Sequence, residues 1–334
     1  MTVVDVVAVV LWVGVTLYAV FGGADFGAGM WDLLAGGATR GAEPRALMER
    51  AIGPVWEANH TWLIFDLVVL WTAFSLAFAS IMETLFIPLS LAALGIVLRG
   101  CGFAFRKLAG GLANQRALGA TFAVSSVLTP FFMGTVVGGI ASGRVPAGGQ
   151  AGDPVASWTG PLSVVVGALF VASCAYLSAV FLVTEARRAG DERLARYFTA
   201  RAIGAGAVAG ALAVVGVLAL RSDARLVYDG LASEGLTLVV LSVLCGAAAM
   251  VLLARGARRG VRPLAVAAVT AVVWGWGVAQ YPFLLPDSLT LEAAAAPSAT
   301  MVALLVVFGA AAVVVVPALV LLFRLQQRSA LGEE

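Results

Sequence analysis

The residues best suited to chemistry in this sequence are acids and one histidine that lie inside long apolar stretches. Asp25 lies in the first stretch, and Glu57 and His60 lie in the second. An ionisable group inside a membrane is costly, by about 2.5–3.5 kcal/mol for Asp at a helix centre, so such groups are functional candidates. Because carboxylates and imidazoles accept and release protons, this set predicts a proton path.

Helical spacing brings these residues to similar depths. Asp25 lies about ten residues before the inner end of its stretch, which is roughly 15 Å at the rise of an α-helix. Glu57 lies only a few residues into the next stretch, which starts from the same side. Asp25 shares a helix face with Asp32, and Glu57 shares one with His60, because their spacings are close to whole turns.

Two interpretations of the acids remain open. In the first, they conduct protons from the cytoplasm towards a buried site. In the second, they hold helices together, with Arg99 and Arg50 neutralising their charge. The second interpretation suits Asp32 and Glu83, which lie near helix ends. Asp66 lies about mid-span, and the sequence offers no partner for it.

A metal centre on this chain is not expected. His60 is the only histidine, whereas a six-coordinate haem takes two strong axial ligands and a di-iron site takes several His and carboxylate ligands. Cys101, Cys174 and Cys245 are far apart and form no CxxC pair. We therefore expect no directly bound cofactor and a hydrogen-bonding or proton-relay role for His60.

The composition indicates a membrane environment. The 334 residues are 61% hydrophobic and 12% charged, with a mean hydropathy of +0.99, whereas soluble domains carry about 25% charged residues. The formal net charge is only +2, and the basic residues are dispersed along the chain. Nucleic acid is therefore not an expected partner.

We expect an all-α, polytopic membrane protein with about nine transmembrane helices, because a helix needs roughly 20 apolar residues to cross the bilayer. Residues 1–334 form a single integral membrane domain, in which eight spans form two four-helix bundles and one helix is peripheral. The junction between the second and third spans, near 80–83, has no turn residues. The nine expected spans are 3–34, 53–79, 83–104, 118–141, 160–184, 202–220, 236–254, 263–285 and 299–323.

The basic residues indicate the orientation, because cytoplasmic loops carry an excess of Lys and Arg. With Arg99 set aside as intramembrane, three of the remaining basic residues fall in one set of connecting segments: Arg144, Arg221 and Arg225. The other seventeen fall in the opposite set: Arg40, Arg45, Arg50, Arg106, Lys107, Arg116, Arg187, Arg188, Arg193, Arg196, Arg201, Arg255, Arg258, Arg259, Arg262, Arg324 and Arg328. We predict that the N-terminus lies outside and the C-terminus in the cytoplasm.

Small residues surround Asp25. Gly23 and Gly27 form a small-xxx-small step, which favours close approach of another helix. We expect a structural or partner-facing role for them, as for Arg99 and Gln280. Gln280 is a polar amide near the outer end of the eighth span, where an aromatic belt explains the neighbouring Trp residues but not the amide.

Three motifs resemble those of a known family. The segments 21–29 (FGGADFGAG), 53–62 (GPVWEANHTW) and 277–282 (GVAQYP) are similar to the signatures of subunit II of cytochrome bd quinol oxidase, a bacterial terminal oxidase. Their order and spacing are similar too, as is the position of Arg99, and the resemblance covers the whole chain.

The resemblance implies a multi-pass bacterial cell membrane protein paired with a haem-bearing subunit I. That subunit carries two b-type haems, one d-type haem and the quinol-oxidising loop, so the chemistry is expected there. The family also implies a bound structural quinone and small single-span accessory subunits. Asp25 and Glu57 match the acids of its proton-entry path, and Asn59 is their polar neighbour. Many relatives carry Asp where this chain has Glu57.

Two other functions remain open from the residues alone. A transporter or permease subunit would also bury carboxylates between helices, although no pair of Gly- or Pro-broken helices recurs in matching positions of two halves. A purely structural membrane scaffold would retain full activity after every buried acid is neutralised.

Overall fold

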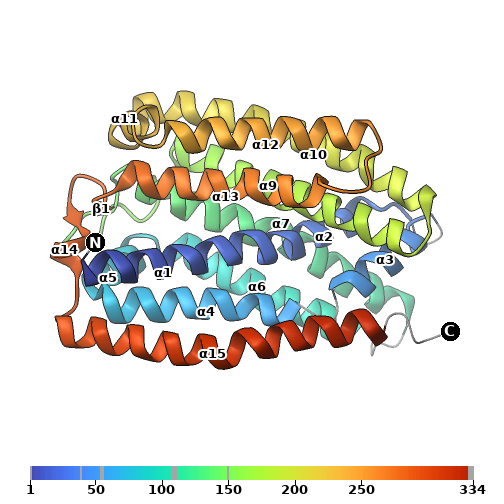
Figure 1. Cartoon of the computed structure of the whole chain (residues 1–334), viewed down its shortest axis with the longest axis horizontal. Helices are drawn as coiled ribbons and strands as arrows, with labels where there is room; N and C mark the ends of the chain where they lie inside the picture. The colour runs from blue at the N-terminus through green and yellow to red at the C-terminus, as the bar shows by residue number, and fades with distance from the viewer. Residues whose placement is uncertain (1, 38–39, 53–55, 107–110, 149, 330–334) are drawn as a thin grey trace.

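The computed structural model describes residues 2–37, 40–52, 56–106, 111–148 and 150–329. Helices dominate these residues, and the expected all-α fold of a polytopic membrane protein is confirmed (Figure 1). Eight described helices are long and apolar enough to cross a membrane, and a bent pair of helices is the ninth candidate. The helices are α1 (Val3–Leu17), the π-helical turn η1 (Tyr18–Gly22), α2 (Gly23–Leu34), α3 (Ala42–Ile52), α4 (Trp56–Ala73), α5 (Ser75–Thr84), α6 (Phe86–Arg106), α7 (Leu112–Ala141), α8 (Ala156–Thr159), α9 (Pro161–Arg188), α10 (Glu192–Asp223), α11 (Arg225–Ala232), α12 (Leu236–Ala254), α13 (Val261–Gln280), α14 (Leu291–Ala294) and α15 (Ser298–Ser329).

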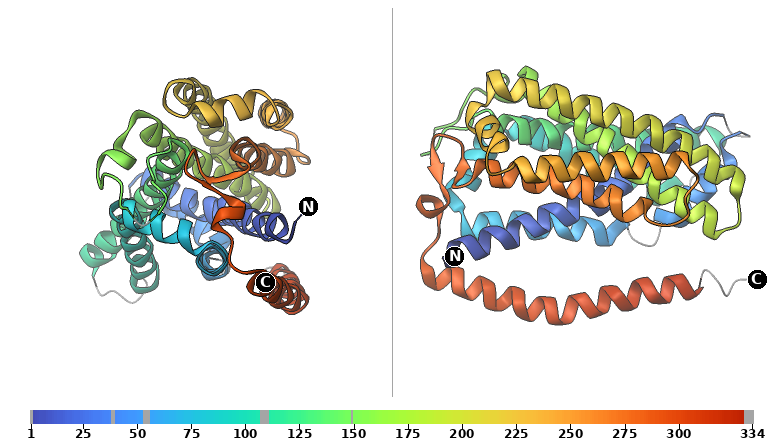
Figure 2. Two further views of the ribbon diagram at one scale, coloured as in Figure 1. Left: turned by 90° about the vertical axis from the view of Figure 1, so that its left-hand side faces the viewer. Right: turned by 45° about the horizontal axis from the view of Figure 1, so that its top comes forward.

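The long helices form two groups and one outlying helix. The continuous α1–η1–α2 rod packs with α4, α6 and α7, and the second group comprises α9, α10, α12 and α13. The groups meet where α9 packs against α2 and α7. Helix α15 lies along the outside of the first group, against α1 and α4 (Figure 2). The start of α1 and the end of α15 lie at opposite ends of the long axis (Figure 1).

The second span differs from its expected range of 53–79. Helix α4 ends at Ala73, and α5 leaves at an angle of 117° to it. The break falls at Phe74, whose backbone has φ −135° and ψ 53° and whose side chain is fully buried. Neither Gly nor Pro lies at this position. The bend therefore follows from burial of the Phe74 ring in the core and not from turn-forming residues.

The eighth span also differs from its expected range of 263–285. Helix α13 ends at Gln280, because Pro282 offers no backbone N–H to a continuing helix. The chain then forms a short antiparallel hairpin of β1 (Phe283–Leu285) and β2 (Leu289–Thr290). This hairpin lies at the same end of the molecule as the N-terminus (Figure 1).

The fifth and sixth spans extend beyond their expected ranges of 160–184 and 202–220. Helix α9 continues to Arg188, and α10 begins at Glu192. The reversal between them uses Gly190 at φ +74° and Asp191, whose carboxylate accepts a hydrogen bond of 2.8 Å from the Leu194 N–H. Such an N-cap stabilises a helix start by about 1 kcal/mol. The arginines of this region therefore lie on helical ends that project past the apolar core.

Candidate functional site

The most buried charged residues of the described chain are Asp25 on α2 and Arg99 on α6. Arg99 Nη2 donates to Asp25 Oδ1 at 2.7 Å, and Arg99 Nη1 donates to Asp25 Oδ2 at 2.9 Å. Both side chains are 2% exposed. A two-point contact of this kind fixes the geometry of both groups, and it leaves the pair with no net charge inside the bundle.

Two further contacts hold the Arg99 guanidinium. Its Nε donates to Ser126 Oγ of α7 at 2.9 Å, and its Nη2 also donates to the backbone oxygen of Asp25 at 3.1 Å. The rings of Phe26 and Phe122 lie 4.9 Å and 5.0 Å from Arg99 Cζ, within the range of cation–π attraction. The site thus joins α2, α6 and α7.

Glycines allow the close helix contacts around this pair. A Cβ at Gly27 would overlap the backbone carbonyl of Cys174 on α9, and one at Gly29 would overlap Ser126 Oγ. Gly23 also faces α9, next to Cys174 Sγ. The close approach predicted for Gly23 and Gly27 is thus made within this chain, so they do not form an open surface for a partner. Trp31 Nε1 strengthens the same contact by donating to Ala175 O at 2.9 Å.

The polar residues of α4 lie beside the π-helical turn. Asn59 Nδ2 donates to the backbone oxygen of Phe21 at 3.3 Å. The His60 ring lies edge-on to the rings of Tyr18 and Phe26, with centroid distances of 6.2 Å and 5.9 Å. The side chain of Glu57 lies outside the described residues, so only its position near the start of α4 is known.

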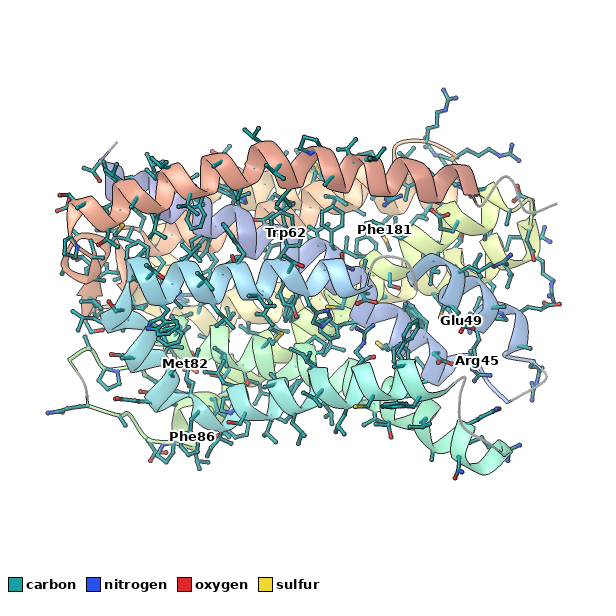
Figure 3. All side chains as sticks on the ribbon, turned by 90° about the horizontal axis from the view of Figure 1, so that it is seen from below. Arg45, Glu49, Trp62, Met82, Phe86 and Phe181 are labelled. Atoms are coloured by element: carbon teal, nitrogen blue, oxygen red, sulfur yellow. The ribbon has the colours of Figure 1, made fainter. Side chains whose placement is uncertain are left out.

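A small cavity lies at the end of the first helix group where α3 follows α2. Its volume is about 40 Å³, and its lining comprises Ala28, Asp32, Arg45, Met48, Glu49, Phe103 and Phe122. Arg45 Nε lies 2.5 Å from Asp32 Oδ1, so Arg45 takes the role expected of Arg50, whose Nε instead donates to Ala46 O at 3.4 Å. Figure 3 shows Arg45 and Glu49 at this end of the bundle.

The cavity shares one lining residue with the surroundings of the Asp25–Arg99 pair. Phe122 lines the cavity, and its ring lies 5.0 Å from Arg99 Cζ. Asp32, which also lines the cavity, lies two residues before the end of α2 and about 10 Å from Asp25 along the helix. One small cavity therefore extends from the Asp32–Arg45 ion pair to the aromatic ring beside Arg99.

Gln280 has a structural position at the other end of the molecule. Its Nε2 donates to Leu284 O at 2.9 Å and Phe283 O at 3.4 Å, and its Oε1 accepts a bond of 2.8 Å from Trp276 Nε1. The amide thus ties the end of α13 to strand β1.

Sequence reasoning missed three residues of the site. Ser126 is one of several Ser and Thr residues in an apolar stretch, and nothing in its spacing singles it out. Tyr18 and Arg45 were likewise not selected, because their roles depend on which helices become neighbours. In the described part of the chain, no group of three or more His, Cys, Asp or Glu side chains is placed to hold a metal.

The fold and site define a polytopic membrane subunit whose charged core pair is enclosed by its own helices. The chain belongs to the cytochrome bd terminal oxidase subunit II family, whose model matches residues 3–326. The family resemblance read from the three motifs is confirmed.

Two relatives support this membership. The solved structure of bd oxidase from Geobacillus thermodenitrificans matches with a TM-score of 0.78 and 26% identity, over 97% of this chain and 98% of that chain. Cytochrome bd ubiquinol oxidase subunit 2 of Bacillus subtilis (strain 168) is 28% identical over 114 residues. That match spans 34% of this chain and only 33% of the relative's length.

Proposed function

We propose that this chain is the non-haem-binding subunit II of a cytochrome bd-type quinol:oxygen oxidoreductase. It supports the haem-bearing subunit and contributes a cytoplasmic proton-entry path for the reduction of oxygen to water. The observation that carries the proposal is the buried Asp25–Arg99 pair, together with a small cavity at the proposed inner end of the bundle whose lining includes Asp32, Arg45 and Glu49.

The cavity can supply water to the path. A site needs roughly 10–15 Å³ to hold one water molecule, together with polar partners. The cavity volume of about 40 Å³ is large enough for two or three waters. Asp32, Arg45 and Glu49 provide the polar partners. Protons can therefore pass from the inner surface to the level of Phe122 along hydrogen-bonded water.

The contacts of Arg99 suit an acid that gains and loses a proton. When Asp25 accepts a proton, the guanidinium loses an ionic partner but retains Ser126 Oγ and the backbone oxygen of Asp25. Arg99 thus stays in place in both states and can draw the carboxylate back after the proton leaves. Asn59 and His60, beside η1, and Glu57, near the start of α4, are the remaining members of the proposed path.

The oxidase chemistry belongs to a partner in this proposal. His60 is the only histidine of the sequence and packs edge-on against the Tyr18 and Phe26 rings, and we assign it no haem. Two b-type haems and one d-type haem are assigned to subunit I, with which this chain forms a heterodimer. A structural quinone, membrane lipid and small accessory subunits are further proposed partners, and the location is the bacterial cell membrane with the N-terminus outside.

Turnover of the assembled complex tests the proton path. Asp25→Asn is expected to slow oxygen consumption by roughly tenfold or more, while the haem absorbance spectrum stays intact. Asp25→Glu should restore part of the rate, because it retains an acid. Asp153→Asn, in an exposed outer loop, is the matched control. Normal turnover of Asp25→Asn with intact haem would overturn the path.

The same pair also favours a second candidate, a purely structural role. A buried ion pair that joins three helices can serve only to fix their packing. In that case Asp25→Asn would reduce assembly and haem content together, and the molecules that do assemble would turn over at the normal rate.

A further inference from the structure

A second acid lies half-buried in the first helix group, apart from the Asp25–Arg99 pair. Asp66 on α4 points at Gly14 of α1, and a Cβ on Gly14 would overlap Asp66 Oδ1. The carboxyl therefore occupies the space that the missing side chain leaves. Asp66 lies ten residues after Trp56, the first residue of α4, or about 15 Å along the helix. This places the carboxyl near the middle of the span.

No described cation neutralises Asp66. Its Oδ1 is buried and has no hydrogen-bond partner among the described residues. Its neighbours belong to an apolar cluster that includes Leu11, Phe65 and Val69, and Phe308 of α15 lies 5.0 Å from the Phe65 ring. An ionised carboxylate in such surroundings is strongly unfavourable unless it is paired. A neutral, protonated carboxyl removes that cost.

A second buried polar group lies one helical turn beyond Gly14 on the same rod. Tyr18 follows Gly14 by one turn of the rod, and its hydroxyl is buried without a hydrogen-bond partner among the described residues. The His60 ring lies edge-on to the Tyr18 ring, with a centroid distance of 6.2 Å. Two buried polar groups with unused hydrogen-bonding capacity thus lie in one region of the membrane core.

We propose that Asp66 is a second intramembrane proton-binding site, separate from Asp25, in which the carboxyl holds a proton. The Asp66 carboxyl occupies the space beside Gly14, and its Oδ1 has no hydrogen-bond partner among the described residues. The protonated state of Asp66 does not depend on the proposed function of Asp25.

Redox-induced infrared difference spectroscopy of the intact two-subunit complex tests the site. We expect a C=O stretching band of a protonated carboxylic acid that shifts in deuterated water. The band should disappear in Asp66→Asn, move in Asp66→Glu and persist in Asp25→Asn. Tyr18→Phe keeps the Asp66 carboxyl and should retain the band.

The infrared spectra of the variants test the Asp66 site separately from the proposed function of Asp25. Absence of the band from the unmodified complex, or its survival in Asp66→Asn, would overturn the site. The unmodified complex and Asp66→Glu remain decisive if Asp66→Asn does not assemble. Normal turnover of Asp25→Asn would refute the proposed function and leave the Asp66 band unaffected.

Discussion

Arg99 and Asp25 lie 74 positions apart in the sequence, and their side chains meet through two hydrogen bonds of 2.7 Å and 2.9 Å inside the helix bundle. Ser126 adds a third helix to this contact. The pair is consequently both a packing element and the most deeply buried charged group of the proposed path.

Replacing one member of the Asp25–Arg99 pair should reduce the stability of the complex more than replacing both. Arg99→Met leaves the Asp25 carboxylate uncompensated, and breaking a buried pair in this way costs about 3–5 kcal/mol. The double variant Asp25→Leu/Arg99→Met removes both charges and should recover much of that loss. Thermal unfolding of the assembled complex, followed by Trp fluorescence, measures both effects. A double variant as unstable as Arg99→Met would show that the net charge of the site is unimportant.

The contact of α2 with α9 should not tolerate a side chain at Gly27. In Gly27→Ala, the new Cβ meets the backbone carbonyl of Cys174, which cannot rotate away, and overpacking of this kind costs about 1–3 kcal/mol. Gly204→Ala on α10 is the control, because a Cβ there has open space. Ala is also the better helix former by about 1 kcal/mol, so the two variants should shift the unfolding temperature in opposite directions.

Gln280 should stabilise the hairpin after α13. In Gln280→Leu, Trp276 Nε1 loses its acceptor and the Leu284 carbonyl loses its donor, and each unsatisfied buried group costs about 1–3 kcal/mol. Hydrogen exchange of residues 283–290 should therefore become faster. Gln150→Leu, at an exposed loop position, should leave the exchange unchanged. Equal protection in both variants would refute this role.

The proposed orientation can be tested by labelling with a membrane-impermeant thiol reagent. Cys101, Cys174 and Cys245 are first replaced by Ala. Ser233→Cys, between α11 and α12, should then react in intact cells, whereas Ala189→Cys, between α9 and α10, should react only after permeabilisation. Both positions are exposed, so accessibility within the protein does not differ. The reverse pattern would place the N-terminus in the cytoplasm.

The helical architecture was largely predictable, because span length and composition are properties of local sequence. The limits of the eighth span were less so, although Pro282 carried a signal for its end. The bend at Phe74 could not be predicted, since it follows from burial of that ring against residues distant in the sequence.

The candidate site was predictable only as a set of residues. The sequence located Asp25 and Arg99 in apolar stretches and offered Arg99 as a neutralising partner, but it also offered Arg50. The choice between them depends on which faces of α2 and α6 meet. Ser126 and Tyr18 carry no local pattern, because their importance arises from the helices packed against them.

The π-helical turn at Tyr18–Gly22 determines the directions in which the side chains of α2, the helix that follows it, point. A π turn accommodates one more residue than an α turn, and each residue corresponds to about 100° of rotation in an α-helix. Before the turn, Gly14 faces α4; after it, Asp25 faces α6 and Gly27 faces α9. Loss of a single residue from this turn would leave every span intact and yet turn the Asp25 carboxylate away from Arg99. One extra residue in the π-helical turn therefore determines which helix the acids after it face. A hydropathy profile does not show this residue.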